Sequence, residues 1–339
     1  MRRCFPVFLV LLGCALAASA DSAYQVVQRL PLGGSGGWDY PSVDAATHLL
    51  YLSRADHVGV VDTASGKDVG DIPDTAGVHG IALAPELGRG YVSCGKADQV
   101  KVFDLKTRAV LATVATGAGP DAIVYEPASR RVLAFNGRGH SASVIDAASN
   151  AVVATIPLDG KPEFARADGR GMVYVNIEDK AELAAIDARS AAVKAVWPLP
   201  HCEGPSGLAL DAAHRRAFST CDNQTLAVTD VDSGKAVARV AIGKGPDGAE
   251  FDPATQTVFS ANGEGNVTVV RELAPDRYQV RQTLPTQRGA RTIALDAATH
   301  RLYLPTADFG PAPPATVDNP HARPQPVPGT FVVLVVGAP

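Results

Sequence analysis

Short apolar runs alternate with short polar turns along most of the chain, and the stretch from Pro205 to Gly245 shows the pattern most clearly. Its four apolar runs, separated by turns rich in Asp, Asn, Ser and Gly, are Leu208–Leu210, Ala217–Thr220, Leu226–Val228 and Ala236–Ile242. Short runs that alternate, contain β-branched residues and are bounded by turn formers are typical of β-strands. The 41-residue stretch therefore predicts a four-stranded antiparallel meander.

The same unit recurs along the chain, and successive copies begin 40 to 44 residues apart. The residues that open the first strand of each copy are Trp38, Val78, Pro120, Pro162, Pro205, Pro246 and Ala290. Repeats of this length with four strands each are typical of a radial β-propeller. A linear stack of the same sheets would expose two long edges, which proteins avoid. The sequence therefore predicts an all-β fold, a seven-bladed β-propeller with four-stranded antiparallel blades, in a single domain over residues 21–339.

The two ends of the chain indicate how the ring closes. The seventh unit ends at Phe331–Val336, which would be its third strand, and no fourth strand follows. An additional strand pattern, Tyr24–Leu30, precedes the first unit and matches fourth strands such as Tyr278–Leu284. We therefore expect the N-terminal strand to complete the last blade.

Residues 1–20 have the pattern of a secretory signal peptide. Arg2 and Arg3 form a charged start, an apolar run follows, and Ala18–Ala20 provides a small-residue cleavage site before Asp21. Cleavage as a lipoprotein before Cys14 is the alternative, although it would leave an unusually short signal. The apolar run is too short to span a bilayer. The expected location is thus periplasmic or secreted.

Charge and cysteine content narrow the picture further. The formal net charge of −4 over 339 residues, without a Lys/Arg cluster, gives no support for nucleic-acid binding. Outside the signal the chain has three cysteines. The hairpin after Pro205 should place Cys221 opposite Pro205, within reach of Cys202 in the preceding joint. Since export permits disulfides, we expect Cys202 and Cys221 to be bridged and Cys94 to be free.

Three motifs accompany the repeats and carry a family resemblance. Third strands end in Asp, as in Val60–Asp62, and joints carry Gly-x-Gly-Pro-Asp, as in Gly117–Asp121. The second strands end in tetrads such as Tyr51–Arg54, Tyr91–Cys94, Tyr174–Ile177 and Phe259–Asn262. Residues 24–336 resemble the YVTN β-propeller repeat family, and the whole chain is similar to exported bacterial proteins of the YncE-like group. The shortened fourth unit and the insertion in the seventh depart from the pattern. The resemblance implies a fold and says little about function, because propellers host unrelated activities.

One mouth of the central channel is the candidate site. In a propeller the innermost strand of each blade starts at one face and the second strand returns to it, so opener and tetrad residues converge there. Mouths of closed β-folds often bind ligands, and the alternative is that these residues only form local turns. The candidate ligand-binding residues are Asp39, Arg54, His79, Asp121, Asn136, Glu163, Asn176, Asp247, Asn262 and Arg291.

A proline-rich insertion in the seventh unit should lie over the same mouth. Residues 305–330 contain eight prolines, and long loops of this kind are either functional or passive. As a lid, the loop would use Asp308, Phe309, His321 and Arg323. The opposite mouth carries three similar turns that we interpret as structural, namely Asp44–His48, Asp211–His214 and Asp296–His300.

These observations favour a non-catalytic binding or scaffold protein of the cell envelope. The sequence contains no Gly-x-Ser-x-Gly elbow, phosphate-binding loop or c-type haem signature. We expect a monomer without a membrane span that binds a small molecule or an envelope protein. Two alternatives stay open: a hydrolase or lactonase using a divalent metal held by acids such as Asp121, Glu163 and Asp247, and a redox-associated periplasmic module.

Overall fold

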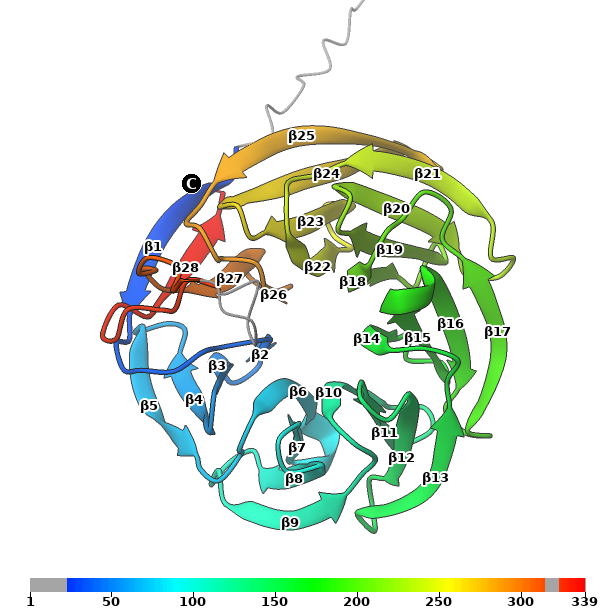
Figure 1. Ribbon diagram of the computed structural model, residues 1–339, viewed down its shortest axis with the longest axis horizontal. Helices are drawn as coiled ribbons and strands as arrows, with labels where there is room; N and C mark the ends of the chain where they lie inside the picture. The colour runs from blue at the N-terminus through cyan, green and yellow to red at the C-terminus, as the bar shows by residue number, and fades with distance from the viewer. Residues whose placement is uncertain (1–22, 315–322, 339) are drawn as a thin grey trace, which may run out of the picture.

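The computed structural model, described over residues 23–314 and 323–338, contains seven four-stranded antiparallel sheets. The sheets are arranged radially around a central channel, with the first strand of each blade innermost (Figure 1). The seven-bladed propeller predicted from the repeat is therefore confirmed. The described residues contain no helix long and apolar enough to cross a membrane. The signal and its cleavage site fall outside these residues.

The blades follow one another in chain order. Blades 1 to 3 consist of β2 (Pro41–Asp44), β3 (Leu49–Arg54), β4 (His57–Asp62), β5 (Lys67–Ile72); β6 (Val78–Ala84), β7 (Arg89–Cys94), β8 (Gln99–Asp104), β9 (Val110–Ala115); and β10 (Pro120–Glu126), β11 (Arg131–Asn136), β12 (Ser141–Asp146), β13 (Ala151–Pro157). Blades 4 to 6 consist of β14 (Pro162–Ala167), β15 (Met172–Ile177), β16 (Glu182–Asp187), β17 (Ala192–Pro198); β18 (Pro205–Asp211), β19 (Arg216–Cys221), β20 (Thr225–Asp230), β21 (Ala236–Ala241); and β22 (Pro246–Asp252), β23 (Thr257–Asn262), β24 (Asn266–Ala274), β25 (Arg277–Pro285). Two short 3-10 helices are η1 (Pro85–Leu87) and η2 (Glu178–Lys180).

The seventh blade joins the two ends of the chain, as predicted. It consists of β26 (Ala294–Asp296), β27 (Arg301–Thr306), β28 (Val332–Gly337) and the N-terminal strand β1 (Gln25–Pro31). Strand β1 pairs antiparallel with β28, and Leu30 lies opposite Val333. Because β1 occupies the outer edge of this blade, the first and last strands hold the ring closed.

The core lies between neighbouring blades. The second and third strands are almost entirely buried, whereas the outer strands are mostly exposed or half-buried. Buried side chains form clusters that each join two adjacent blades. In the cluster between blades 7 and 1, Phe331 and Tyr303 pack with Leu50 and Leu52. Burial of this apolar surface at every blade boundary is the main force that holds the ring together.

The acids that recur at strand ends are turn caps. At the end of β20, Asp230 accepts hydrogen bonds from the backbone N–H groups of Asp232 and Ser233. At the opposite mouth, Asp211 accepts them from Ala213 and His214, and Asp296 from Ala298. Carboxylates that satisfy backbone donors in this way stabilise tight turns. The interpretation of these turns as structural therefore agrees with their hydrogen bonds.

Two details of the fold differ from the alignment of the repeats. Strand β2 begins at Pro41 and β26 at Ala294, each a few residues after the opener assigned from sequence. The intervening backbone bonds to neighbouring blades instead: the Gly248 N–H donates to the Arg291 carbonyl, and the Thr292 hydroxyl donates to the Asp39 carbonyl. These contacts across the channel wall replace ladder pairing within the blade.

The expected disulfide is present. Cys202 and Cys221 are bonded with a Cα–Cα distance of 5.3 Å, and Cys221 pairs with Pro205 in the ladder as predicted. Cys94 is free and buried. The bridge ties the joint before blade 5 to the end of its second strand, at the same face as the candidate mouth.

Candidate functional site

An irregularity at the start of the inner strands positions the site. The ladder to the second strand skips residues between Val78 and Ile81, and the same break follows Pro120, Pro162 and Pro205. Bulges bend a strand and re-aim its side chains. Here they release from the ladder the residues that follow the openers. Those residues include His79, Asp121 and Glu163.

His79 stands between two acids of neighbouring blades. Its Nδ1 lies 2.6 Å from Asp39 Oδ2 and 3.6 Å from Asp121 Oδ1. Burial alone would lower the pKa of His79, but the hydrogen bond to Asp39 and the charge of Asp121 outweigh it and raise the pKa to about 9. Burial and the Asp39 charge raise the pKa of Asp121 to about 6, although His79 opposes the shift. The three side chains thus form a cluster that is protonated in part at neutral pH.

Glu163 continues the acidic ring in blade 4. The Lys161 ammonium lies 3.2 Å from Glu163 Oε2 and also contacts Glu178, yet the Oε2 atom is buried without a hydrogen bond of proper geometry. Burial and the charge of Asp121 raise the pKa of Glu163 to about 8. Crowded carboxylates raise one another's proton affinity in this way because burial disfavours their charged forms.

Asp247 and Arg291 complete the ring between blades 6 and 7. Arg291 Nε lies 3.1 Å from Asp247 Oδ2. Burial raises the pKa of Asp247 to about 7 despite this pair. Of the sequence-predicted residues that follow the openers, Asp39, His79, Asp121, Glu163, Asp247 and Arg291 are all brought to this mouth. We call these six residues the acidic ring.

Tyr40 closes the floor of the acidic ring. It is 5 % exposed, and burial together with the charges of Asp247, Asp39, Glu163 and Asp121 raises the pKa of its hydroxyl well above the usual range. Its ring meets Phe164 edge-on at 4.5 Å between centroids. Because Tyr40 belongs to blade 1 and Phe164 to blade 4, this pair spans the channel beneath the mouth.

We call Tyr40 and Phe164 the aromatic plug. The sequence contains a signal for these two residues. The second residue after each opener is Gly, Ala or Thr in five units and aromatic only at Tyr40 and Phe164. A small residue is required where a neighbouring strand passes closely: a Cβ on Gly207 would lie 2.6 Å from the Asp247 carbonyl. Two large side chains at positions that are otherwise small therefore mark the constriction. Sequence reasoning missed them.

Below the Tyr40–Phe164 pair, an ion pair lines the channel. Arg166 lies 2.7 Å from Glu250 and donates to the carbonyls of Leu208 and Ala249. Its guanidinium also lies over the Phe164 ring at 4.7 Å. Burial raises the pKa of Glu250, and Arg166 opposes that shift. The Tyr40–Phe164 pair and this ion pair therefore narrow the channel below the acidic ring, around a cavity of about 210 Å³.

The four tetrad residues predicted for the mouth do not join the acidic ring. Asn136, Asn176 and Asn262 are fully buried, and Asn176 donates to the carbonyls of Ser206 and Gly207 in the next blade. The asparagines thus serve hydrogen bonds inside the wall. Arg54 packs over Phe331 at 3.6 Å and donates to the Gly33 and Ser35 carbonyls, since it ends a second strand that turns toward the N-terminal segment.

A cavity of about 470 Å³ adjoins the acidic ring under the proline-rich loop. Its side-chain lining comes from blades 1 and 7 and from the loop, and comprises Trp38, Arg288, Arg291, Phe309, Arg323 and Gln325. The centroids of Trp38 and Phe309 are 5.9 Å apart, and the Arg288 guanidinium lies over Phe309 at 5.8 Å. We call this the arginine cavity. Sequence analysis did not identify Trp38 or Arg288 as site residues.

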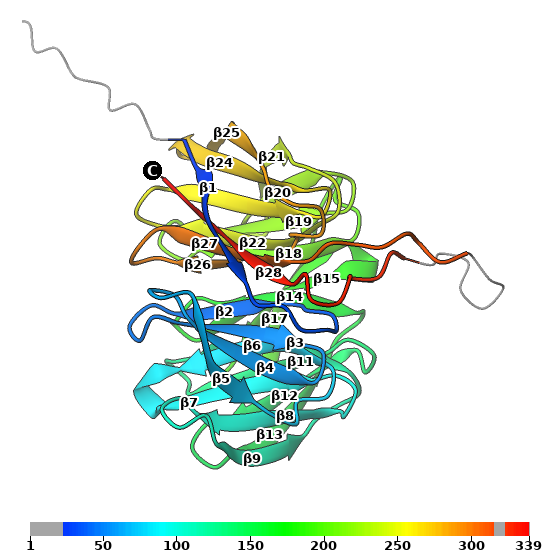
Figure 2. The same cartoon turned by 90° about the vertical axis from the view of Figure 1, so that its left-hand side faces the viewer.

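The described ends of the loop pair with each other above this cavity. The Gly310 N–H donates to the Gln325 carbonyl, and the Val327 N–H donates to the Asp308 carbonyl. Both described ends of the loop project from the mouth face in side view (Figure 2). Of the predicted lid residues, Phe309 and Arg323 line the cavity, Asp308 accepts a hydrogen bond from Gln287, and His321 lies outside the described residues.

Two sets of side chains have the composition of a metal site. One is Asp39, His79 and Asp121 at the mouth, and the other is Asp211, His214 and Glu272 at the opposite face. Within each set the potential ligand atoms lie within 4.8 Å of one another. The sequence-based set of Glu163, Asp121 and Asp247 does not form such a group among the described residues.

Solved structures share this fold. A structure described as U3-55K and one described as the WD40 repeats of RRP9 each superpose with a TM-score of 0.75 at 11% identity, over 91% of this chain and 97% of theirs. A chain of the mitotic checkpoint complex gives 0.74 at 12%, over 99% and 98%. No protein-family model matches the sequence, and no curated protein matches it. These likenesses show the fold alone, which is a seven-bladed β-propeller; the YVTN resemblance stays a prediction.

Proposed function

We propose that this protein is an exported, non-catalytic binding propeller of the cell envelope, and that its mouth binds a small organic anion with a planar apolar part. The arginine cavity is the observation that carries the proposal. Its volume of about 470 Å³ falls in the range typical of small-molecule sites. WD40-like neighbours, which are typically scaffolds or binding modules, support a binding role.

The chemistry of the lining selects an anion. Arg291 is already paired with Asp247. Arg288 has no carboxylate within ion-pair distance in the part of the chain that the structure describes, and its guanidinium rests on Phe309 instead. A guanidinium without a carboxylate partner keeps its N–H donors available for carboxylate, sulfonate or phosphate groups.

The two aromatic rings select a planar apolar body. Trp38 and Phe309 come from opposite ends of the chain and meet at the cavity wall. Aromatic side chains provide large contact areas and favour offset or edge-on arrangements with other rings. A ligand with one anionic group and one flat apolar group would contact both kinds of lining.

The export part of the proposal rests on residues 1–20 and on the disulfide. Cys202 and Cys221 are bonded, and disulfides persist in oxidising compartments such as the periplasm. Export is tested by fractionation and N-terminal sequencing of the tagged protein. Protein that begins at Asp21 in the envelope or medium is expected, and full-length protein in the cytoplasm would contradict it.

The binding proposal can be tested with the fluorescent probe 1-anilinonaphthalene-8-sulfonate, which combines a sulfonate with flat rings. The chain has two tryptophans, so the Trp197→Phe variant leaves Trp38 as the only energy donor. We expect probe emission to rise when Trp38 is excited. Arg288→Ala and Phe309→Ala should each weaken binding roughly tenfold or more, since a hydrogen bond to a charged group contributes about 1.5–3 kcal/mol.

Arg239→Ala is the matched control for this titration. Arg239 is exposed on the outer strand β21, remote from the arginine cavity. Its replacement removes the same charge and should leave probe affinity unchanged. Equal affinity in wild type, Arg288→Ala and Phe309→Ala would refute the arginine cavity as the binding site.

A further inference from the structure

We propose that Asp39, His79 and Asp121 bind a divalent transition-metal ion such as Zn²⁺ at the channel mouth. The site uses three adjacent blades and none of the side chains that line the arginine cavity. The proposal therefore goes beyond the binding of an organic anion and does not depend on it.

The spacing of the three side chains suits a small ion. With metal–ligand bonds of about 2.0–2.2 Å in tetrahedral geometry, ligand atoms stand roughly 3.4 Å apart. The distance from His79 Nδ1 to Asp121 Oδ1 is 3.6 Å, close to this value. The distance from Nδ1 to Asp39 Oδ2 is 2.6 Å, a hydrogen bond that must open slightly when the metal replaces the Nδ1 proton.

Unsatisfied polar groups around the cluster provide an independent observation. Among the described residues, the Asp121 carboxylate accepts no hydrogen bond, and the side chain of Tyr40, a residue that is 5 % exposed, makes none. The electrostatic contacts of Tyr40 with four acids place this hydroxyl toward the acidic ring. Buried polar atoms normally have partners. A cation bound between Asp39, His79 and Asp121 would supply a partner to the Asp121 carboxylate.

Charge balance also favours a divalent cation. Lys161 is engaged with Glu163 and Glu178, and Arg291 with Asp247. These cations are therefore committed elsewhere in the ring. Two carboxylates and a neutral imidazole leave two negative charges, which one divalent ion neutralises.

The ligand types decide which ion is expected. One imidazole nitrogen with two carboxylate oxygens suits Zn²⁺ and related transition metals, whereas Ca²⁺ and Mg²⁺ prefer all-oxygen sites. Three protein ligands also leave a coordination position open. That position would face the mouth, because His79 is the most exposed of the three side chains.

The opposite face offers a matched comparison. The set of Asp211, His214 and Glu272 has a similar composition, but Asp211 Oδ1 already accepts two backbone N–H groups and its Oδ2 accepts His214. The neighbouring Arg216 charge also acts on His214. Because its main carboxylate is fully bonded, we expect this set to bind no metal.

The experiment is calorimetric titration of the metal-free mature protein with ZnCl₂. We expect one Zn²⁺ per chain, and His79→Gln and Asp121→Asn should each weaken binding at least about tenfold, in line with the sensitivity of metal sites to ligand changes. His214→Gln should bind as wild type. Absence of Zn²⁺ binding by wild type, unchanged binding by both mouth variants, or loss of binding in His214→Gln would overturn the proposal.

Further measurements on the same variants make the result of the zinc titration interpretable. Urea denaturation shows whether each variant still folds, and the anilinonaphthalene sulfonate titration reports on the arginine cavity alone, so the two proposals fail separately. Co²⁺ should give visible absorption typical of a nitrogen and oxygen site in wild type and in His214→Gln. Folded His79→Gln protein with the wild-type Co²⁺ spectrum would contradict the assignment of His79 as a ligand.

Discussion

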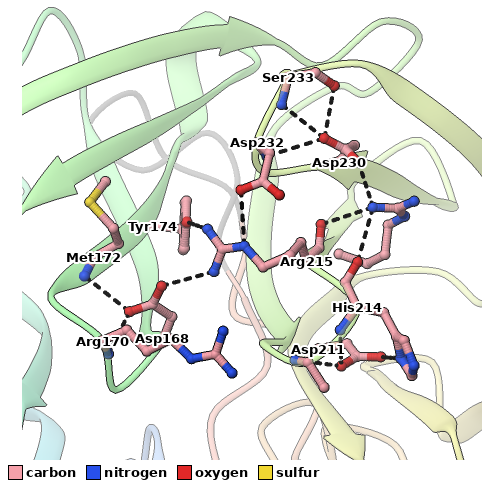
Figure 3. A network of polar contacts seen from close by, with 12 residues as sticks. Asp168, Arg170, Met172, Tyr174, Asp211, His214, Arg215, Asp230, Asp232 and Ser233 are labelled. Atoms are coloured by element: carbon pink, nitrogen blue, oxygen red, sulfur yellow. Dashed lines mark hydrogen bonds and ion pairs between the residues drawn. The ribbon is translucent and has the colours of Figure 1, made fainter.

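Acids at the two ends of the inner strands differ in how many hydrogen-bond donors and cations they contact. At the mouth, Asp121 and Glu163 are crowded, poorly supplied with donors and shifted toward their protonated forms. At the opposite face, Asp168 accepts the N–H groups of Arg170 and Met172 and pairs with Arg215 at 2.9 Å (Figure 3). The difference in bonding, rather than residue type, separates acids that stabilise the fold from acids that are available to a ligand.

The backbone explains why the two ends differ. A tight turn at the opposite face presents several N–H groups to one carboxylate, as at Asp168 and Asp211. A bulge at the mouth turns its side chains toward the channel, and side chains such as Ser93 and Asn176 satisfy the freed carbonyls. Few donors then remain for the acids of the mouth. Such an arrangement costs stability, which is typical of binding sites.

The largest change in the free energy of unfolding should follow from Asp168→Ala. Its carboxylate is almost fully buried, and its loss leaves two turn N–H groups without their acceptor and Arg215 with the exposed Asp232 and the Tyr174 hydroxyl. Breaking a buried pair from one side costs about 3 kcal/mol or more. Urea denaturation should show a stability loss of this order, and a loss below about 1 kcal/mol would contradict the comparison.

Glu163→Gln should change the free energy of unfolding in the opposite direction to Asp168→Ala at high pH, and so stabilise the protein. Glu163 is ionised at pH 9 against burial and against Asp121, while Lys161 keeps Glu178 as a partner. Relief of this repulsion should stabilise the protein by about 1–2 kcal/mol at pH 9 and by little at pH 5. The same denaturation series at both pH values measures it. A destabilised variant at pH 9 would remove the contrast between the two faces.

Stability should fall as pH rises from about 4 to 9. The folded pKa of His79, about 9, lies above its ordinary 6.5, so its contribution is complete below 6.5 and is lost by about 9. The folded pKa values of Asp121, Asp247 and Glu163, about 6, 7 and 8, are also raised, so their contributions are present near pH 4 and disappear as pH passes those values. Both kinds of group therefore act in the same direction.

The melting temperature between pH 5 and 9 checks this dependence. Wild type should lose several degrees, at roughly 2 °C per kcal/mol for a domain of this size. An Asp247→Asn, Glu163→Gln double variant should show a flatter profile, because two of the titrating groups are gone. A wild-type profile that rises with pH over this range would show that the mouth acids do not titrate as described.

The smallest effect should come from His214→Ala. The His214 side chain is exposed, and Asp211 keeps its two backbone donors without it. Exposed ion pairs contribute about 0–1 kcal/mol. We expect less than 1 kcal/mol in denaturation and an unchanged probe titration. A weakening of probe binding would mean that the opposite face communicates with the mouth.

Much of the fold could be predicted from the sequence because the propeller repeats a local pattern. Polar turns at fixed intervals specify the strands, and the unpaired strand at each end predicts that the N-terminal strand completes the last blade, where Leu30 lies opposite Val333. The disulfide follows from the register of a single hairpin. These features depend on interactions within a blade or on simple closure.

The site was less predictable because it depends on contacts between blades. Residues that follow the openers, such as Asp121, were identified because the repeat places them at the same point of each unit, whereas Asn176 was misplaced because its side chain points into the next blade. Arg288 and Trp38 gain their roles from the loop that folds over them. That packing joins residues from both ends of the chain, and no local pattern reports it.

Native mass spectrometry of the protein purified from the envelope tests the central claim most directly, namely that the mouth is the binding face. We predict a chain that begins at Asp21, with one disulfide and a non-covalent ligand of small mass. The ligand should be absent from an Arg288→Ala, Phe309→Ala double variant and retained in Arg239→Ala. A bare wild-type chain, or a ligand that the double variant retains, would contradict the account.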